Sequence, residues 1–377
     1  MNIIAIFSSN KITNGASKRY IELLRQLSDK GHQITFIAES DMGLKNIDHI
    51  KIRTPKGILP KRFELIKQVL FNIKRIKTDT KNSDFIMVFG ETNILASIIL
   101  KKLLKIPLYI GIRSNIYISK KIKVYKSGLG IGKIKSKNSF LLKVYMSLVL
   151  KYERFLYNRA NGIIVQNMDD YNHIYDLVKH DNINIIPNNL NVSWIDNSYA
   201  NSNDSTELKK IIFVGSLNER KGILFLVEAI NKLIMEGKKL ELIVLGDGPQ
   251  QKEIETYIEK HKLKSFVKMY GHVNDPAFYI RNSDLLVVPS IFDSFPNVIL
   301  ESLNIGTPVI GSDIGGIKVQ LEYKELLFRP ASEESIYNKL KWLLDKENYI
   351  ICKGLCEERK EMFVFDWAQE FEKVFDL

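Results

Sequence analysis

An acidic pair stands where a strand, a loop and a helix are expected to follow one another. Asp293 lies in the loop after the apolar run 285–289, and Glu301 follows eight positions later, within the helix expected over 298–304. The first amides of that helix, from Asn297 onward, carry partial positive charge, so this end suits a phosphate group. By spacing alone, the same residues also fit an ordinary acidic loop and helix.

Two adjacent cations follow another apolar run, 210–214, in a loop that contains two glycines. Backbone amides near Gly215 can approach an anion closely because glycine has no side chain. Arg220 offers a planar fork and Lys221 a point charge, which together suit a diphosphate. Taken alone the pair is a weak signal, because adjacent arginine and lysine are common on protein surfaces.

Two weaker motifs follow further strands. Residues 246–249, Gly-Asp-Gly-Pro, form a tight turn after the strand expected over 240–245, and His272 follows Gly271. Each has a plain structural explanation, as a turn and as a lone structural histidine.

Taken in order, the four motifs resemble those of the retaining glycosyltransferases of family 4. The likeness covers nearly the whole chain, is strong over 211–316 and diffuse before it, and includes residues 306–310, Gly-Thr-Pro-Val-Ile, and Gly315-Gly316. It implies an α/β fold of the GT-B type, with two Rossmann-like, doubly wound parallel-sheet domains that face each other across a cleft.

The resemblance also implies roles for single residues. Arg220 and Lys221 would hold the donor diphosphate, and Glu301 would bind the ribose hydroxyls. Asp293 would hold the donor sugar, with the amides of 295–298 on the phosphate. The catalytic residues implied are Asp293, Arg220, Lys221 and Arg113. The donor-binding residues implied are Gly15, Gly215, Ser216, Arg220, Lys221, Gly246, His272, Val273, Asp293, Phe295, Pro296, Asn297, Val298 and Glu301.

Three residues depart from the family pattern. Asp293 stands where a glutamate is usual, and Ser216 where an arginine is common, so Arg220 is expected to supply that charge. Arg113 follows the strand expected over 108–112, where the family often has a histidine. It would face the donor sugar or the acceptor, although a surface arginine after a strand fits equally well.

The chain contains no Asp-X-Asp pair, which other transferases use to hold a divalent metal on the diphosphate. We therefore expect no metal and no other cofactor, with fixed cations and helix amides stabilising the leaving diphosphate. No two carboxylates are placed for double displacement. By the resemblance, the acceptor attacks from the face that the diphosphate leaves, and the leaving phosphate oxygen takes the acceptor proton.

Short apolar runs, expected to be strands, alternate along the chain with segments of helical periodicity. This alternation is typical of parallel doubly wound sheets, whose strand ends would position these residues. At 377 residues the chain has room for two such domains. An Asn- and Ser-rich stretch marks the break. We predict an acceptor-binding domain over 1–190, a linker over 191–209, a nucleotide-sugar domain over 210–360, and a C-terminal helix over 361–377 that packs back on the first domain.

The net charge of +12 has a local source. Lysines gather in 119–137, before an apolar helix expected over 140–152, and this combination suits an anionic membrane or a lipid-linked acceptor. A solvated loop beside a buried helix is the alternative. The membrane or acceptor residues proposed are Lys120, Lys121, Lys123 and Lys126.

We expect a hexosyltransferase that moves a hexose or N-acetylhexosamine, with UDP-sugars favoured, to a lipid-linked lipopolysaccharide, capsule or exopolysaccharide. No run reaches the ~18 apolar residues of a membrane span and no leader is visible, so a cytoplasmic protein, peripheral on the inner membrane face, is expected. The alternatives are a nucleotide-sugar 2-epimerase of the same fold and a basic nucleic-acid-binding protein. No basic face interleaved with aromatics is visible, so no nucleic-acid partner is expected.

Overall fold

The structure, a computed structural model, describes residues 1–9, 11–12, 15–53, 61–113, 116–118, 139–190 and 206–375, with only the backbone at 61 and 139–142. The chain forms two compact units. The first contains Met1–Pro187 together with Trp367–Leu377, and the second contains Asn188–Asp366.

The first unit is built on a parallel sheet whose strand order is β3-β2-β1-β4-β5-β6-β7. Most of its strands are continuous apolar runs because helices cover both faces. The strands are β1 (Asn2–Ile6), β2 (Gln33–Ala38), β3 (Asp48–Lys51), β4 (Phe85–Phe89), β5 (Leu108–Gly111), β6 (Gly162–Val165) and β7 (Ile183–Ile185).

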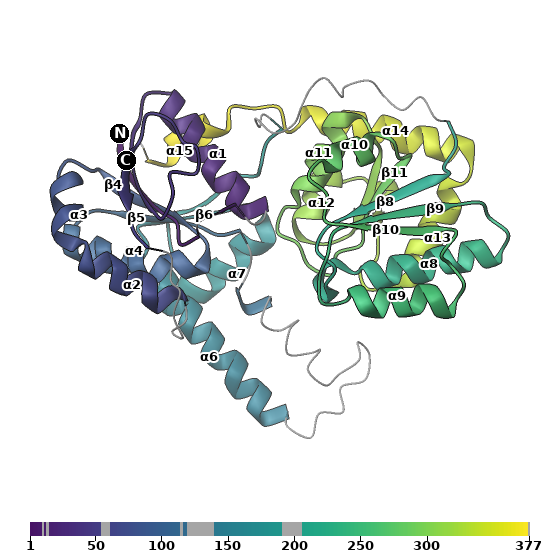
Figure 1. Ribbon diagram of the computed structural model, residues 1–377, viewed down its shortest axis with the longest axis horizontal. Coiled ribbons are helices and arrows are strands. Elements are labelled where there is room, and N and C mark those ends of the chain that lie inside the picture. The colour runs from purple at the N-terminus through teal and green to yellow at the C-terminus, as the bar shows by residue number, and fades with distance from the viewer. Residues whose placement is uncertain are drawn as a thin grey trace. The chain divides into compact units, whose positions relative to one another are not determined.

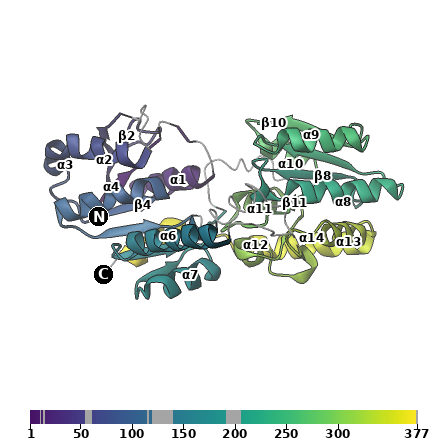
Figure 2. The ribbon, with the colours of Figure 1, turned by 90° about the horizontal axis from the view of Figure 1, so that it is seen from below.

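Helices cover both faces of this sheet (Figures 1 and 2). One face carries α1 (Gly15–Asp29) and α15 (Trp367–Phe375), which contact each other. The other carries α2 (Lys61–Phe71), α4 (Glu91–Leu104), α6 (Ser139–Tyr157) and α7 (Met168–Val178), with the short α3 (Ile73–Asp79) after α2. Within the described part of the chain, no helix combines the length and apolarity that crossing a bilayer requires.

The second unit repeats the architecture, with strand order β10-β9-β8-β11-β12-β13 and parallel pairing. Its strands are β8 (Lys210–Val214), β9 (Glu241–Leu245), β10 (Val267–Gly271), β11 (Leu285–Val288), β12 (Val309–Ser312) and β13 (Leu327–Phe328). Two doubly wound parallel sheets confirm the predicted fold class.

The helices of the second unit also lie on both faces of their sheet (Figure 1). On one face lie α8 (Ile223–Met235), α9 (Gln251–Lys260) and α13 (Glu333–Leu343). On the other lie α10 (Pro276–Arg281), α11 (Asn297–Ile305) and α14 (Lys346–Glu361), and α12 (Gly315–Leu321) contacts both α11 and α14. Two 3₁₀ turns are η2 (Glu219–Lys221) and η3 (Lys324–Leu326).

The second unit begins at Asn188, earlier than the start at residue 210 that the sequence predicts. Leu190 is buried in the core of the second unit, and its N–H donates to the carbonyl oxygen of Phe363 at 2.8 Å. Leu208, placed in the predicted linker, is buried in the same core. Residues 191–205 lie outside the described residues.

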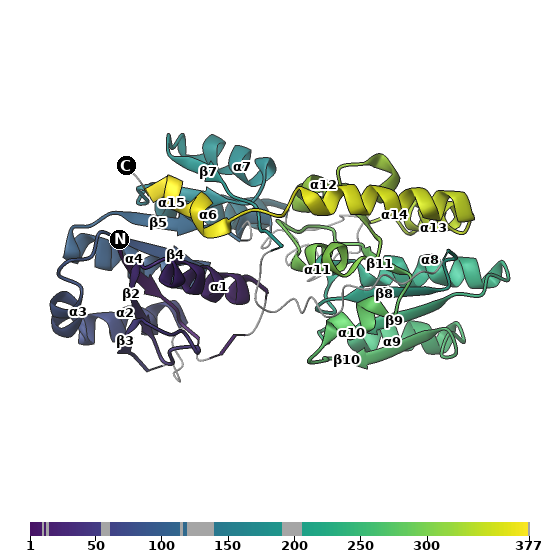
Figure 3. The ribbon, with the colours of Figure 1, turned by 90° about the horizontal axis from the view of Figure 1, so that it is seen from above.

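The C-terminal helix α15 returns to the first unit and packs beside α1 (Figure 3). Trp367, Phe371 and Phe375 are buried on one side of it, and the ring centroid of Phe375 lies 4.5 Å from that of Phe85 in β4. Each buried aromatic side chain of this kind contributes roughly 1.5–3 kcal/mol to stability. The tail of the chain is therefore part of the first unit's fold.

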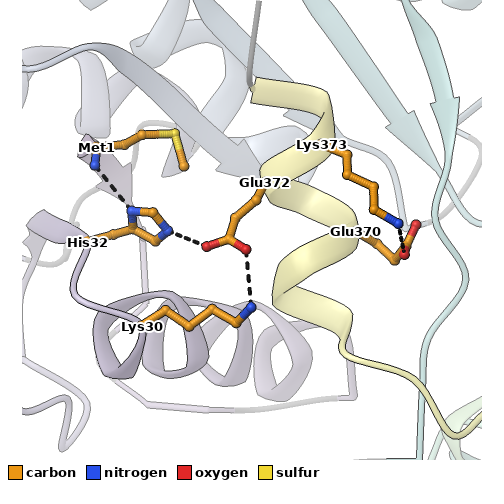
Figure 4. A network of polar contacts seen from close by, with 6 residues as sticks. All are labelled: Met1, Lys30, His32, Glu370, Glu372 and Lys373. Atoms are coloured by element: carbon orange, nitrogen blue, oxygen red, sulfur yellow. Dashed lines mark hydrogen bonds and ion pairs between the residues drawn. The ribbon is translucent and has the colours of Figure 1, made fainter.

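A polar network at the chain start reinforces this docking (Figure 4). The N-terminal amine of Met1 lies 3.1 Å from Nδ1 of His32, and Nε2 of His32 lies 2.6 Å from Oε1 of Glu372 in α15. The Lys30 ammonium lies 3.1 Å from Oε2 of the same carboxylate. Burial raises the pKa of Glu372, but His32 and Lys30 outweigh it and hold the pKa below its usual value.

Glu372→Gln should therefore lower the free energy of unfolding by roughly 1 kcal/mol near neutral pH. A lowered carboxyl pKa stabilises the fold above the usual glutamate pKa, and this stability is lost as pH falls through the lowered value. Urea denaturation across pH should show the deficit vanish in acid. Glu370→Gln is the matched control, because Glu370 pairs with Lys373 of its own helix, α15. Equal deficits in the two variants would contradict the interaction.

Candidate functional site

The candidate site of the second unit lies where its strand order reverses. β8 is flanked by β9 on one side and β11 on the other, so the loops after β8 and β11 leave the sheet at a topological switch point. Ligands bind at such points, outside the carboxyl ends of parallel strands. The loop after β8 carries Arg220 and Lys221, and the loop after β11 carries Asp293.

An ion cluster joins these two loops. The Lys221 ammonium contacts Oδ2 of Asp293, and the guanidinium Nη1 of Arg220 lies 3.7 Å from Oδ1. Ser290 donates its hydroxyl to Oδ2 at 3.5 Å. Asp293 is only 8% exposed, so the contacts form in a largely desolvated setting. The structure therefore brings together three predicted residues, Arg220, Lys221 and Asp293, although Lys221 and Asp293 are 72 positions apart in sequence.

The electrostatics of Asp293 indicate its protonation state. Burial raises the pKa of its carboxyl group, but Lys221 first and Arg220 second outweigh this and hold the pKa below its usual value. The carboxylate is thus ionised at neutral pH and is not poised to donate a proton. It neutralises one of the two cations, so the cluster of Arg220, Lys221 and Asp293 keeps one net positive charge.

Glycines let the neighbouring loops approach backbone to backbone. A Cβ atom at Gly222, whose φ is +67°, would lie 1.9 Å from the carbonyl oxygen of Pro289. One at Gly246 would lie 2.0 Å from the oxygen of Gly215. The Ile291 N–H donates to the carbonyl oxygen of Arg220 at 2.8 Å, so the two loops of the ion cluster are also joined through their backbones.

Helix α11 begins beside the ion cluster. Pro296 is its N-cap residue and brings no side-chain acceptor, and the first turn contains no acidic residue. The Asn188 side-chain amide donates to Oδ1 of Asn297 at 2.9 Å and holds the entry to the helix. Glu301 lies one turn further along α11 and is half-buried. This arrangement offers positive helix-end amides to an anion.

The remaining predicted donor residues lie along the same strand ends. Ser216, after β8, is exposed and donates its hydroxyl to the carbonyl oxygen of Asp247 at 3.3 Å. His272, after β10, is exposed, and Val273 packs against the core. Phe295 is buried against Phe363, with ring centroids 5.9 Å apart. Phe295 can therefore offer a ligand only its backbone.

Other predicted residues belong elsewhere. Gly15 begins α1 in the first unit, and Arg113 follows β5 in that unit. Lys120, Lys121, Lys123 and Lys126 lie outside the described residues. Within the described ranges, no group of three or more His, Cys, Asp or Glu side chains is arranged to bind a metal ion.

Sequence analysis missed three residues that interact with predicted ones. Ser290 contacts Asp293, while Trp367 and Arg19 lie around Arg113 in the first unit. Ser290 had no motif to single it out. The sequence predicts a C-terminal helix that packs on the first domain, but which of its side chains meets Arg113 is set by tertiary structure alone.

Comparisons with known proteins cover both units. The model of "Glycosyltransferase Family 4" matches residues 13–194, and that of "Glycosyl transferases group 1" matches residues 196–362. The uncharacterized glycosyltransferase MJ1059 of Methanocaldococcus jannaschii is 26% identical in an alignment 310 residues long that covers 76% of this chain and 70% of that protein.

Two solved structures share the architecture. Anabaena Alr3699/HepE, solved in complex with UDP and glucose, superposes with a TM-score of 0.72 at 17% identity, over 99% of this chain and 98% of that one. WaaG, a glycosyltransferase involved in lipopolysaccharide biosynthesis, superposes with a TM-score of 0.73 at 15% identity and the same coverage. At these identities the likeness concerns the fold alone, and it confirms the GT-B type.

The close packing around Gly316 predicts that an added methyl group lowers the stability of the protein. A Cβ at Gly316 would lie 1.7 Å from the carbonyl oxygen of Ser294, in the loop that carries Asp293. Gly316→Ala should therefore destabilise the protein by about 2–3 kcal/mol, because backbone must move. Gly354→Ala is the matched control, since its Cβ would meet nothing within 4 Å and alanine favours a helix. Urea denaturation that finds both variants as stable as the parent would contradict this packing.

Proposed function

The chain belongs to glycosyltransferase family 4, and we propose that it moves a hexose or N-acetylhexosamine from a UDP-sugar to a lipid-linked cell-surface glycan with retention of configuration. The contact of Lys221 and Arg220 with Asp293, at the switch point of the second sheet, carries the donor half of the proposal. It supplies a net positive charge where a nucleotide diphosphate would bind.

The proposed chemistry needs charge stabilisation at the leaving group. The bond between the anomeric carbon and the phosphate oxygen breaks, and negative charge grows on the diphosphate. Lys221, Arg220 and the first amides of α11 would stabilise that charge through fixed positions. Asp293, ionised and held by both cations, would keep them aimed at the diphosphate. The leaving phosphate oxygen would then take the proton of the acceptor hydroxyl.

A donor panel tests the proposal. UDP-, GDP-, ADP- and dTDP-sugars are each incubated with the protein, and hydrolysis or transfer is followed by chromatography, with and without EDTA. We expect a UDP-sugar to be consumed and the rate to survive EDTA, because the cations at the site are side chains. No turnover of any donor would contradict the proposal. If EDTA abolishes the rate and Mg²⁺ or Mn²⁺ restores it, the metal-independent mechanism is wrong.

Glu301 is proposed to bind the ribose hydroxyls from the second turn of α11. A hydrogen bond to a charged group contributes about 1.5–3 kcal/mol, so Glu301→Ala should weaken UDP binding roughly ten- to a hundredfold. Calorimetry with UDP measures this. Glu255→Ala, an exposed change in α9, is the control that should leave affinity unchanged. Parent-like affinity in Glu301→Ala would remove this residue from the site.

The lipid-linked acceptor and the peripheral location rest on a basic and apolar region of the first unit. α6 exposes Leu148 at 58% and Phe155 at 42%, with exposed Lys143 and Lys151 beside them. A helix with apolar residues between lysines suits the interface of an anionic bilayer. The lysine-rich segment 119–137 precedes this helix in the sequence.

Changing Lys120, Lys121, Lys123 and Lys126 to Gln should reduce binding to anionic liposomes, most clearly at low salt. Each lysine near such a surface contributes about 1 kcal/mol, which salt screens. Co-sedimentation across ionic strength measures the effect. The matched control changes four exposed lysines of the second unit, Lys252, Lys260, Lys262 and Lys264, to Gln. Equal loss in both variants, or no binding by the parent, would exclude a membrane role for the segment.

A further inference from the structure

Gln320 is a buried polar side chain of α12 that contacts the start of α11. Its exposed fraction is 0%, and its Nε2 donates to the carbonyl oxygen of Pro296, the N-cap residue of α11, at 3.1 Å. Its Oε1 is also buried and meets no hydrogen-bond partner among the described residues. A buried polar atom without a partner costs free energy, so stability alone does not account for a glutamine at this position.

The Pro296 carbonyl oxygen has a second donor. The Ile299 N–H, in the first turn of α11, reaches the same oxygen at 3.3 Å. The oxygen would therefore keep a hydrogen bond if an apolar side chain replaced Gln320. What Gln320 adds is direction. A peptide group is planar and trans, so a donor that holds the Pro296 oxygen on one side fixes the Asn297 N–H on the opposite side.

The loop before α11 is held in the same way, through its carbonyl oxygens. The Gly316 N–H donates to the carbonyl oxygen of Asp293 at 3.2 Å. The Asn188 side chain reaches the carbonyl oxygen of Phe295 at 3.5 Å. Together with Gln320, these donors turn three negative carbonyl ends toward α12 and Asn188. A carbonyl oxygen repels an anion, so this orientation favours a phosphate at the start of α11.

Helix α12 is in turn fixed by Arg359 of α14. Nε of Arg359 donates to the carbonyl oxygen of Gln320 at 2.9 Å, and Nη2 donates to that of Val319 at 2.8 Å. The same guanidinium contacts the carboxylate of Glu322, which ends the helix. These bonds satisfy the last carbonyl groups of a short helix. Gln320 therefore stands on a rigid support, as a residue that orients a binding group must.

We propose that Gln320 is a positioning residue for the donor diphosphate, because it holds the Pro296 carbonyl group so that the first amides of α11 face the phosphates. Gln320 touches neither the nucleotide nor the sugar and acts through the peptide group between Pro296 and Asn297. The inference rests on the proposed binding of a nucleotide diphosphate at the second unit.

Gln320→Met tests the proposal, since methionine has a similar volume and no donor. We expect a urea midpoint equal to or above that of the parent, because the unpartnered Oε1 is gone. UDP should bind about five- to tenfold more weakly, because hydrogen bonds to a charged group become misaligned. Calorimetry measures this affinity. Uridine has no phosphate, so ligand-observed NMR should find its affinity unchanged. If GDP, ADP or dTDP binds the parent instead of UDP, that nucleotide and its nucleoside are used.

Asn231→Leu is the matched control, a buried amide of α8 in the same unit. Nδ2 of Asn231 lies 3.3 Å from the hydroxyl oxygen of Tyr257 and 3.4 Å from Nδ1 of His261. Leucine there should lower the urea midpoint and leave UDP affinity unchanged. The two variants thus separate stability from binding in opposite directions.

Parent-like UDP affinity in Gln320→Met would overturn the inference while the proposed function stands. An equal loss of affinity for UDP and uridine would overturn it too, and so would a variant that does not fold, because Gln320 would then serve the fold. A parent that binds none of UDP, GDP, ADP and dTDP would instead contradict the proposed function, and this inference with it.

Discussion

The contact between Lys221 and Asp293 is the interaction on which the second unit's site depends. It joins the loops after β8 and β11, the two strands between which the chain order reverses. A lysine so placed would be mobile without its carboxylate partner, and a buried carboxylate would cost several kcal/mol without its cations. The glycines around the pair let the backbones of the two loops approach closely, which fixes the positions of the two charges.

The first unit depends on a different constraint, because its last helix comes from the far end of the chain. α15 brings Trp367 to Arg113 and buries Phe371 and Phe375 against the sheet. The same helix is tied to the chain start through Glu372 and His32. The fold that stabilises this unit therefore also completes the aromatic surroundings of Arg113.

Much of this architecture follows from local pattern. The apolar run 210–214 coincides with β8, and the strands expected over 108–112 and 240–245 differ from β5 and β9 by one residue, because a buried parallel strand is a short apolar run. The edge strand β3, Asp-His-Ile-Lys, has one fully buried residue and leaves no such signal. The motifs also pointed to Arg220, Lys221 and Asp293, but not to their mutual contact, which only tertiary structure creates. Arg19 stayed hidden because helical periodicity reports burial without naming the neighbour.

The central claim is that the donor diphosphate binds at the loops gathered around Lys221 and Asp293. Hydrogen–deuterium exchange with and without UDP measures this directly, peptide by peptide. Binding there should slow amide exchange in residues 213–222 and 289–301, which hold the cations and the first turns of α11. Slowed exchange confined to the first unit, or no change in either segment at saturating UDP, would contradict the account.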